Sequence, residues 1–224
     1  MTPAVIRSDL AHKIDHTLVA PAASRQNIIQ LCEEARQHGF HGVCVHGSQV
    51  EAAYAILEDT EIKITCFVGF PFGAVDSDVK RYETEVAVDH GANEIEMVIN
   101  IGRLKDGDRS YVLRELPDVA EAADERPVKV VLETALLTPE ERSLACELVL
   151  DSGAHFVCTG TGLGSPPTVA EVQNLRTLVS EKFGIKASGA ITDRAAAQTL
   201  IAAGATRLGL LNAVTVIGSP QTQD

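Results

Sequence analysis

The sequence predicts an α/β protein, a single-domain (β/α)8 barrel of the TIM type that spans residues 1–224. Short apolar runs alternate with amphipathic stretches of about ten to fifteen residues along the whole chain, as in folds built from repeated strand–helix units. Ionisable residues stand at the ends of several apolar runs, where barrel enzymes carry their chemistry. No linker or shift in composition marks a second domain.

The apolar runs are expected to form parallel strands, because strands buried on both faces read as nearly continuous hydrophobic segments. Their number matches the eight strands of the barrel. The predicted strands cover residues 13–17, 42–45, 62–68, 94–99, 128–132, 155–158, 185–187 and 207–209.

The stretches between the strands carry helix signals. Thr138 precedes Pro139, Glu140 and Glu141, which gives an N-cap, a proline at the first helical position and acidic residues in the first turn. The predicted helices cover residues 24–38, 49–57, 79–90, 110–123, 139–152, 169–183 and 194–203.

Glycines close four of the predicted helices and lead into strands, which forms a weak internal repeat. These are Gly39, Gly91, Gly153 and Gly204. Glycine at this place tolerates the left-handed conformation that ends many helices. The same repeat also fits an ordinary doubly wound sheet, which remains the alternative to the closed barrel.

Composition excludes several classes of function. A net charge of −12 and the lack of a basic patch argue against partners that are nucleic acids or acidic membranes. No apolar run is long enough to span a membrane, and Met1 to Leu10 lack the apolar core of a signal peptide, so the cytoplasm is expected. Five cysteines without CxxC spacing favour neither disulfides nor a zinc site. We expect no metal and no cofactor.

Lys186 is the most informative residue, because it interrupts an apolar run where an ammonium group needs a partner or an open strand end. Burial among apolar neighbours lowers the pKa of a lysine, so Lys186 could form a Schiff base or transfer protons. The alternative is a structural ion pair with Glu133 or Glu96. The spacing alone leaves both interpretations open.

Other strand ends carry further candidates. Glu96 could act as an acid or base, or pair with a cation. Cys158 could be a nucleophilic thiolate if Lys186 lies near enough to lower its pKa, although a cysteine at a strand end is more often inert. Glycine-rich segments at residues 160–164, 188–190 and 209–212 could bind an anion or could simply be tight turns.

Six segments together resemble the deoxyribose-phosphate aldolase family, in the same order and over residues 14–209. They are IDHTL (14–18), KITCFVGFPFGA (63–74), NEIEMVINIG (93–102), VKVVLET (128–134), FVCTGTG (156–162) and IKASG (185–189). The resemblance implies a TIM barrel, a cofactor-free class I aldolase and a homodimer.

The resemblance also assigns roles to site residues, and at one of these positions this sequence differs from the family. The family forms its Schiff base through a lysine at the end of strand six, and Cys158 stands there. A thiol cannot form an iminium. The family's second lysine matches Lys186, its acid/base aspartate matches Glu96, and its strand-one aspartate matches Asp15.

The segments that bind the substrate in the family also differ in this sequence. The family shows Gly-Gly after strand seven and a serine-containing run after strand eight. Here these positions read Gly189-Ala190 and GLLN (209–212), and the tail after residue 217 has no tyrosine. The lost hydroxyls weaken the case for a phosphorylated substrate. Expected substrate-binding residues are Thr161, Gly162, Gly189, Asn212 and Glu133.

Three functions therefore compete. The first is a divergent aldolase-like lyase that makes or breaks a carbon–carbon bond in a small aldehyde or sugar-derived substrate, with Lys186 as the remaining amine. If Lys186 stays cationic, it would serve better as an acid or oxyanion stabiliser than as a nucleophile. The second uses a Cys158 thiolate. The third is a non-catalytic small-molecule binder. Standard cleavage of deoxyribose 5-phosphate is doubtful.

Overall fold

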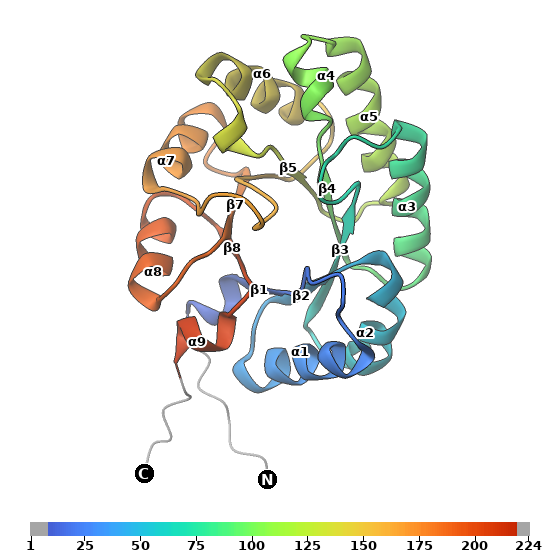
Figure 1. Cartoon of the computed structure of the whole chain (residues 1–224), viewed down its shortest axis with the longest axis vertical. Coiled ribbons are helices and arrows are strands. Elements are labelled where there is room, and N and C mark those ends of the chain that lie inside the picture. The colour runs from blue at the N-terminus through green and yellow to red at the C-terminus, as the bar shows by residue number, and fades with distance from the viewer. Residues whose placement is uncertain (1–8, 219–224) are drawn as a thin grey trace.

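A computed structural model describes residues 9–218, which form a closed barrel of eight parallel strands surrounded by helices (Figure 1). Neighbouring strands follow chain order, and β8 pairs with β1 to close the ring. The predicted barrel is confirmed, and the doubly wound alternative is wrong. The single-domain prediction covered residues 1–224, of which 1–8 and 219–224, including most of the tail without tyrosine, lie outside the described residues.

All eight predicted strands are present, with ends that differ by at most about two residues, the usual uncertainty of sequence-based boundaries. The strands are β1 (Ile14–Thr17), β2 (Gly42–Val45), β3 (Lys63–Val68), β4 (Glu94–Val98), β5 (Val128–Val131), β6 (Phe156–Cys158), β7 (Gly184–Gly189) and β8 (Arg207–Leu210).

The seven predicted helices are also present, and the prediction missed α4, α9 and three short 3-10 helices at Ala11–Lys13, Gly47–Gln49 and Thr134–Leu136. The α-helices are α1 (Arg25–His38), α2 (Val50–Leu57), α3 (Ser77–Asp89), α4 (Ile101–Lys105), α5 (Arg109–Ala122), α6 (Pro139–Leu150), α7 (Val169–Leu178), α8 (Arg194–Ala202) and α9 (Ala213–Ile217).

The largest boundary error concerns α7, which ends at Leu178 and not near residue 183. The Arg176 guanidinium donates hydrogen bonds to the carbonyl oxygens of Ser180, at 2.6 Å, and Phe183, at 3.0 Å. These bonds stabilise a turn outside the helix, which competes with continued helical bonding. Hydrophobic periodicity does not report such a side-chain contact.

The strands enclose a polar interior, while their outer faces pack against the helices in a large apolar core. Asp15 lies in register with Gly42 on one side and Gly209 on the other. A Cβ atom on Gly209 would lie 2.8 Å from Lys186 Cε and 2.5 Å from Ser188 Oγ. Glycine there leaves room for charged side chains at the barrel centre.

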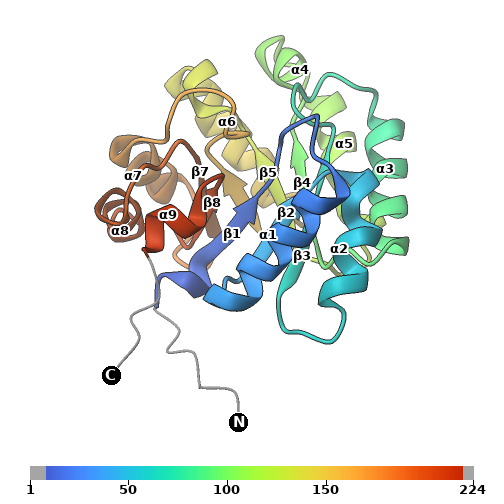
Figure 2. The same ribbon diagram turned by 60° about the horizontal axis from the view of Figure 1, so that its bottom comes forward.

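The loops that follow the strands gather at one end of the barrel. Figure 2 shows the connections after β1, β3 and β6 on the upper side, and the α2–β3 connection on the opposite side. In barrels of this type the reacting groups lie at the carboxyl ends of the strands. No helix in residues 9–218 is long and apolar enough to cross a membrane.

Candidate active site

Lys186 lies inside the barrel on β7 and is only 1% exposed. Its Nζ atom lies 2.8 Å from Asp15 Oδ2 on β1 and 2.5 Å from Glu96 Oε2 on β4. The structure therefore brings together three of the four predicted catalytic residues. It confirms the ion pair with Glu96 that the sequence offered as one alternative.

The surroundings of Lys186 favour its charged form. Burial alone would lower the pKa of Lys186, yet the Asp15 and Glu96 carboxylates raise this pKa well above its ordinary value. Burial would raise the pKa of Asp15, but Lys129, Lys186 and Arg207 bring it well below its ordinary range. Lys186 is thus an ammonium group and Asp15 a carboxylate at neutral pH.

Two further cations complete the cluster. Lys129 Nζ on β5 lies 2.9 Å from Asp15 Oδ2, 2.5 Å from Glu94 Oε2 and 2.9 Å from Thr65 Oγ1. Arg207 Nη1 lies 2.8 Å from Asp15 Oδ1 and 3.2 Å from Glu94 Oε2.

Three carboxylates thus face three cations, and the charges of this ion network balance. Removing one charge from a balanced buried network would leave another charge uncompensated. The ion network consists of Asp15, Glu94, Glu96, Lys129, Lys186 and Arg207.

Cys158 lies on β6 beside Lys186, with which it is in register, and is fully buried. It packs against Val98, Val131 and Phe70. Burial, followed by the Glu96 charge, raises the pKa of Cys158 well above its ordinary value, although Lys186 acts in the opposite direction. The condition for a thiolate, a pKa lowered by Lys186, is therefore not met.

Glu133 was expected to bind substrate or to pair with Lys186, and the structure shows a different contact. Its backbone lies in the left-handed region, at φ 50°, which costs about 1–3 kcal/mol in a residue other than glycine. Its carboxylate Oε1 accepts a hydrogen bond of 2.5 Å from the Thr161 backbone N–H. The pairing of Lys186 with Glu133 is thus wrong, since the Lys186 partners are Asp15 and Glu96.

The other predicted binding residues lie at strand ends. Thr161 and Gly162 belong to the β6–α7 loop, and Gly162 approaches Gly189 at the end of β7. Asn212 is exposed and directly precedes α9. Ser188, which the sequence named only as part of the glycine-rich segment 188–190, is 6% exposed, and its Oγ atom has no hydrogen-bond partner within residues 9–218.

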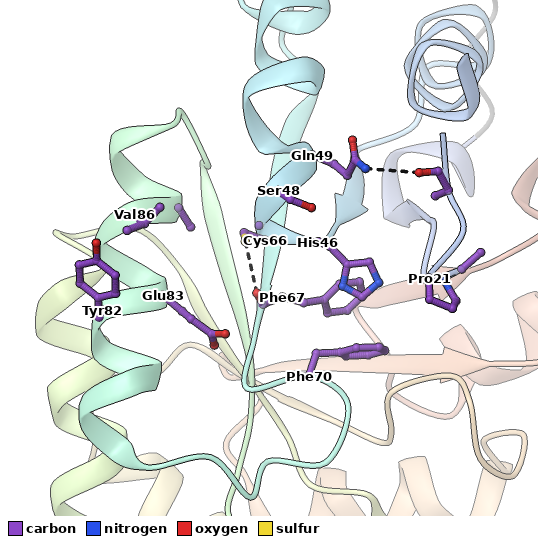
Figure 3. Close-up of a pocket in the computed structure, with 14 residues that line it drawn as sticks. Pro21, His46, Ser48, Gln49, Cys66, Phe67, Phe70, Tyr82, Glu83 and Val86 are labelled. Atoms are coloured by element: carbon purple, nitrogen blue, oxygen red, sulfur yellow. Dashed lines mark hydrogen bonds between the residues drawn. The ribbon is translucent and has the colours of Figure 1, made fainter. Parts of the chain in front are cut away.

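A cavity of about 570 Å³ lies beside the ion network rather than at its centre. It is bounded by the β1–α1 and β2–α2 loops, the end of β3 and α3. Figure 3 shows the rings of His46, Phe67 and Phe70 grouped along one wall. Phe70 also packs against the buried cluster of Val98, Val131 and Cys158, so this ring lies between the cavity and the barrel interior. Neither Lys186 nor Glu96 lines this cavity.

One group of side chains has the spacing of metal ligands. Donor atoms of Asp15, His41 and Glu94 lie within 4.8 Å of one another. Lys129 and Arg207 already neutralise these carboxylates. A divalent cation would have to displace or approach both cations, so this donor set fits a metal poorly.

Lys129 and Arg207 were missed, although Lys129 carried the same signal as Lys186. It interrupts the apolar run Val128–Val131, yet it was not considered as a site residue. Arg207 stands at the first position of β8, which sequence reasoning treats as the end away from the chemistry. Its long side chain still reaches the central carboxylates.

Comparison with known proteins agrees with this geometry. The family model described as DeoC/LacD family aldolase matches residues 10–216. The chain belongs to the DeoC/LacD aldolase family. A deoxyribose-phosphate aldolase of Bdellovibrio bacteriovorus is 44% identical over 96% of this chain and 98% of its own length. One from Thermococcus gammatolerans is 42% identical over 95% of this chain and 97% of its own length.

Solved structures of the family share the fold. Deoxyribose phosphate aldolase from Aeropyrum pernix, described as tetrameric, superposes with a TM-score of 0.87 at 29% identity, over 93% of this chain and 89% of its own. The aldolase QR15 superposes with a TM-score of 0.89 at 31% identity, over 93% of this chain and 94% of its own. The homodimer that the resemblance implies stays a prediction.

Proposed function

We propose that this DeoC/LacD family protein is an aldolase-type lyase for small β-hydroxycarbonyl compounds in which Lys186 acts as a cation and forms no imine. The observation that carries the proposal is the position of Lys186 Nζ between the carboxylates of Asp15 and Glu96. An ammonium group has three N–H donors, and these carboxylates take two. The third can be donated to a substrate carbonyl oxygen.

The chemistry then needs one base and one oxyanion stabiliser. Glu96 takes the proton of the β-hydroxyl group, the carbon–carbon bond breaks, and its electron pair forms an enolate. The Lys186 ammonium stabilises the enolate oxygen. The proton on Glu96 returns to the enolate carbon, which yields two carbonyl compounds and regenerates the carboxylate. No other reactant is consumed.

Asp15 is better suited to positioning than to proton transfer. Its Oδ2 atom faces Lys129 and Lys186, and its Oδ1 atom faces Arg207. A carboxylate with three cationic partners is a weak base. We propose that Asp15 fixes the position of Lys186 while Glu96 moves the proton.

The alternatives agree less well with the contacts. An imine on Lys186 requires the neutral amine, which the adjacent carboxylates disfavour. A Cys158 nucleophile requires a thiolate, which burial disfavours. A non-catalytic binder would explain the ion network as purely structural, and the kinetics of variants separate it from the lyase.

The test uses cleavage of 3-hydroxybutanal to acetaldehyde by the wild type and two variants. We expect Lys186→Met to lose about a hundredfold or more in rate, as when an oxyanion donor is removed. Lys186→Arg should keep measurable activity, because arginine retains the charge but forms no imine.

Borohydride treatment with acetaldehyde gives an independent readout. We expect no reduced adduct on Lys186 and no loss of wild-type activity. An adduct mapped to Lys186, together with complete inactivity of folded Lys186→Arg, would contradict the cationic role. Equal ligand binding by wild type and Lys186→Met, without turnover in either, would indicate the non-catalytic binder.

A further inference from the structure

Barrels commonly bind a phosphate group at the loops after β7 and β8, through backbone N–H groups, helix N-termini and basic side chains. The loop after β6 lies beside them, because Gly162 approaches Gly189. In this chain these loops are residues 159–168, 190–193 and 211–212, and they contain no Lys, Arg or His. Arg194 follows the second loop, and its Nη1–H group donates a hydrogen bond of 3.3 Å to the Ile217 carbonyl oxygen.

One backbone donor of the β6–α7 loop is occupied by a carboxylate of the protein itself. The Thr161 N–H donates to Glu133 Oε1, as described above. A Cβ atom on Gly160 or Gly164 would lie 3.2 or 3.4 Å from Glu133 Oε2, so this loop folds over the carboxylate. A phosphate approaching the loop would meet a negative charge where it needs donors.

The N-termini of α7 and α8 at this end are occupied in the same way, whereas α9 begins without a side-chain cap. Asp193 Oδ1 accepts a hydrogen bond of 2.9 Å from Ala196 N at the start of α8. At the start of α7, Glu171 Oε2 accepts from the Thr168 backbone N–H at 2.8 Å. Backbone hydrogen bonding lowers the pKa of Asp193. Partial burial would raise the pKa of Glu171, but its hydrogen bonds outweigh this effect and lower it. Both carboxyl groups are therefore charged at neutral pH.

Three large apolar side chains face solvent in the loops at this end. Leu136 after β5 is 57% exposed, Leu163 after β6 is 56% exposed, and Leu211 after β8 is 41% exposed. Ser188 Oγ, buried beside Lys186, has no hydrogen-bond partner within residues 9–218 and can receive a neutral hydroxyl group. The site thus offers polar contacts deep in the barrel and apolar contacts at its rim.

We infer that the site selects uncharged hydroxycarbonyl substrates with a neutral or apolar tail and that a phosphate group contributes nothing to binding. This inference rests on the proposed function only for the location of the reacting carbonyl at Lys186. The occupied anion donors, the acidic residues and the exposed leucines concern the other end of the substrate.

The test uses ligand-observed NMR to measure the affinity of the wild type for deoxyribose and for deoxyribose 5-phosphate. We expect the phosphorylated sugar to bind no more tightly than the neutral sugar, and inorganic phosphate to compete with neither. A preference of about tenfold or more for the phosphorylated sugar would overturn the inference.

Matched variants test the electrostatic cause. Leu163→Lys places a cation at the β6–α7 loop, and we expect a gain of about tenfold or more in affinity for deoxyribose 5-phosphate. Leu150→Lys is the control, because Leu150 is also an exposed leucine (40%) but lies at the C-terminal end of α6. This variant should give no gain in affinity for deoxyribose 5-phosphate. Equal behaviour of the two variants would overturn the electrostatic account. Since binding is measured without turnover, failure here is distinguishable from failure of the Lys186 chemistry.

Discussion

At the scale of single residues, we propose that a cysteine in place of a lysine accounts for the charge state of the site. The resemblance places a second lysine where Cys158 stands, and two neighbouring ammonium groups would lower each other's pKa. Here a neutral thiol takes that place. The three cations of the ion network face three carboxylates, and Asp15 and Glu96 outweigh the effect of burial, so Lys186 keeps its proton.

The thiols give a prediction at the same scale. All five cysteines are buried, and burial raises the pKa of Cys32, Cys66 and Cys146 to about 12 each. We expect a chromogenic disulfide reagent at neutral pH to label no thiol of the native protein and all five after unfolding. Rapid labelling of one equivalent, mapped to Cys158, would restore the thiolate hypothesis.

At the scale of elements, a second buried ion pair joins α3, α5 and the end of β4. Lys80 Nζ lies 2.5 Å from Glu115 Oε1 and donates to the Val98 carbonyl at 2.7 Å. Glu115 Oε2 accepts from the Asn100 N–H at 3.1 Å. These contacts anchor the carboxyl end of the strand that carries Glu96, so the pair supports the site without touching it.

Lys80→Met should therefore destabilise the fold by about 3–5 kcal/mol, because it leaves the buried Glu115 carboxyl group without its cation. Lys80→Met with Glu115→Gln should recover more than half of this loss, since the amide can still accept from Asn100. The measurement is denaturant unfolding at neutral pH.

The control for this prediction joins the same two helices at the surface. Arg114 Nη2 lies 2.8 Å from Asp78 Oδ1, and both side chains are more than half exposed. Arg114→Met should cost under about 1 kcal/mol. If Lys80→Met cost as little as Arg114→Met, the buried pair would not hold α3 and α5 together.

At the scale of the whole molecule, local patterns were sufficient to predict the barrel. The alternation of apolar runs located every strand, because parallel strands covered on both faces need near-continuous apolar sequence. Glycine ends and N-caps such as Thr138 placed the helices. The short helices α4 and α9 were missed, since five residues show too little periodicity.

The site was predicted in part. Lys186, Glu96 and Asp15 were identified because each is an ionisable residue in or beside an apolar run, and the barrel rule places their strand ends together. Lys129 and Arg207 contribute through side-chain length and direction, and Glu133 through a left-handed backbone conformation. Such properties depend on tertiary contacts, so the spacing of residues in the sequence does not reveal them.

The central claim is that Lys186 carries a positive charge. The direct measurement is a pH titration of the Lys186 side chain by NMR of the protein with selectively labelled lysine. The Lys186→Arg variant assigns the signal. The Asp15 and Glu96 carboxylates raise the pKa of Lys186 despite its burial, so the ammonium form should persist from neutral pH to above the ordinary lysine value of about 10.4. The stabilisation it gives the fold should be lost only at higher pH. A Lys186 amine that is neutral near pH 7 would contradict the account and restore the imine mechanism.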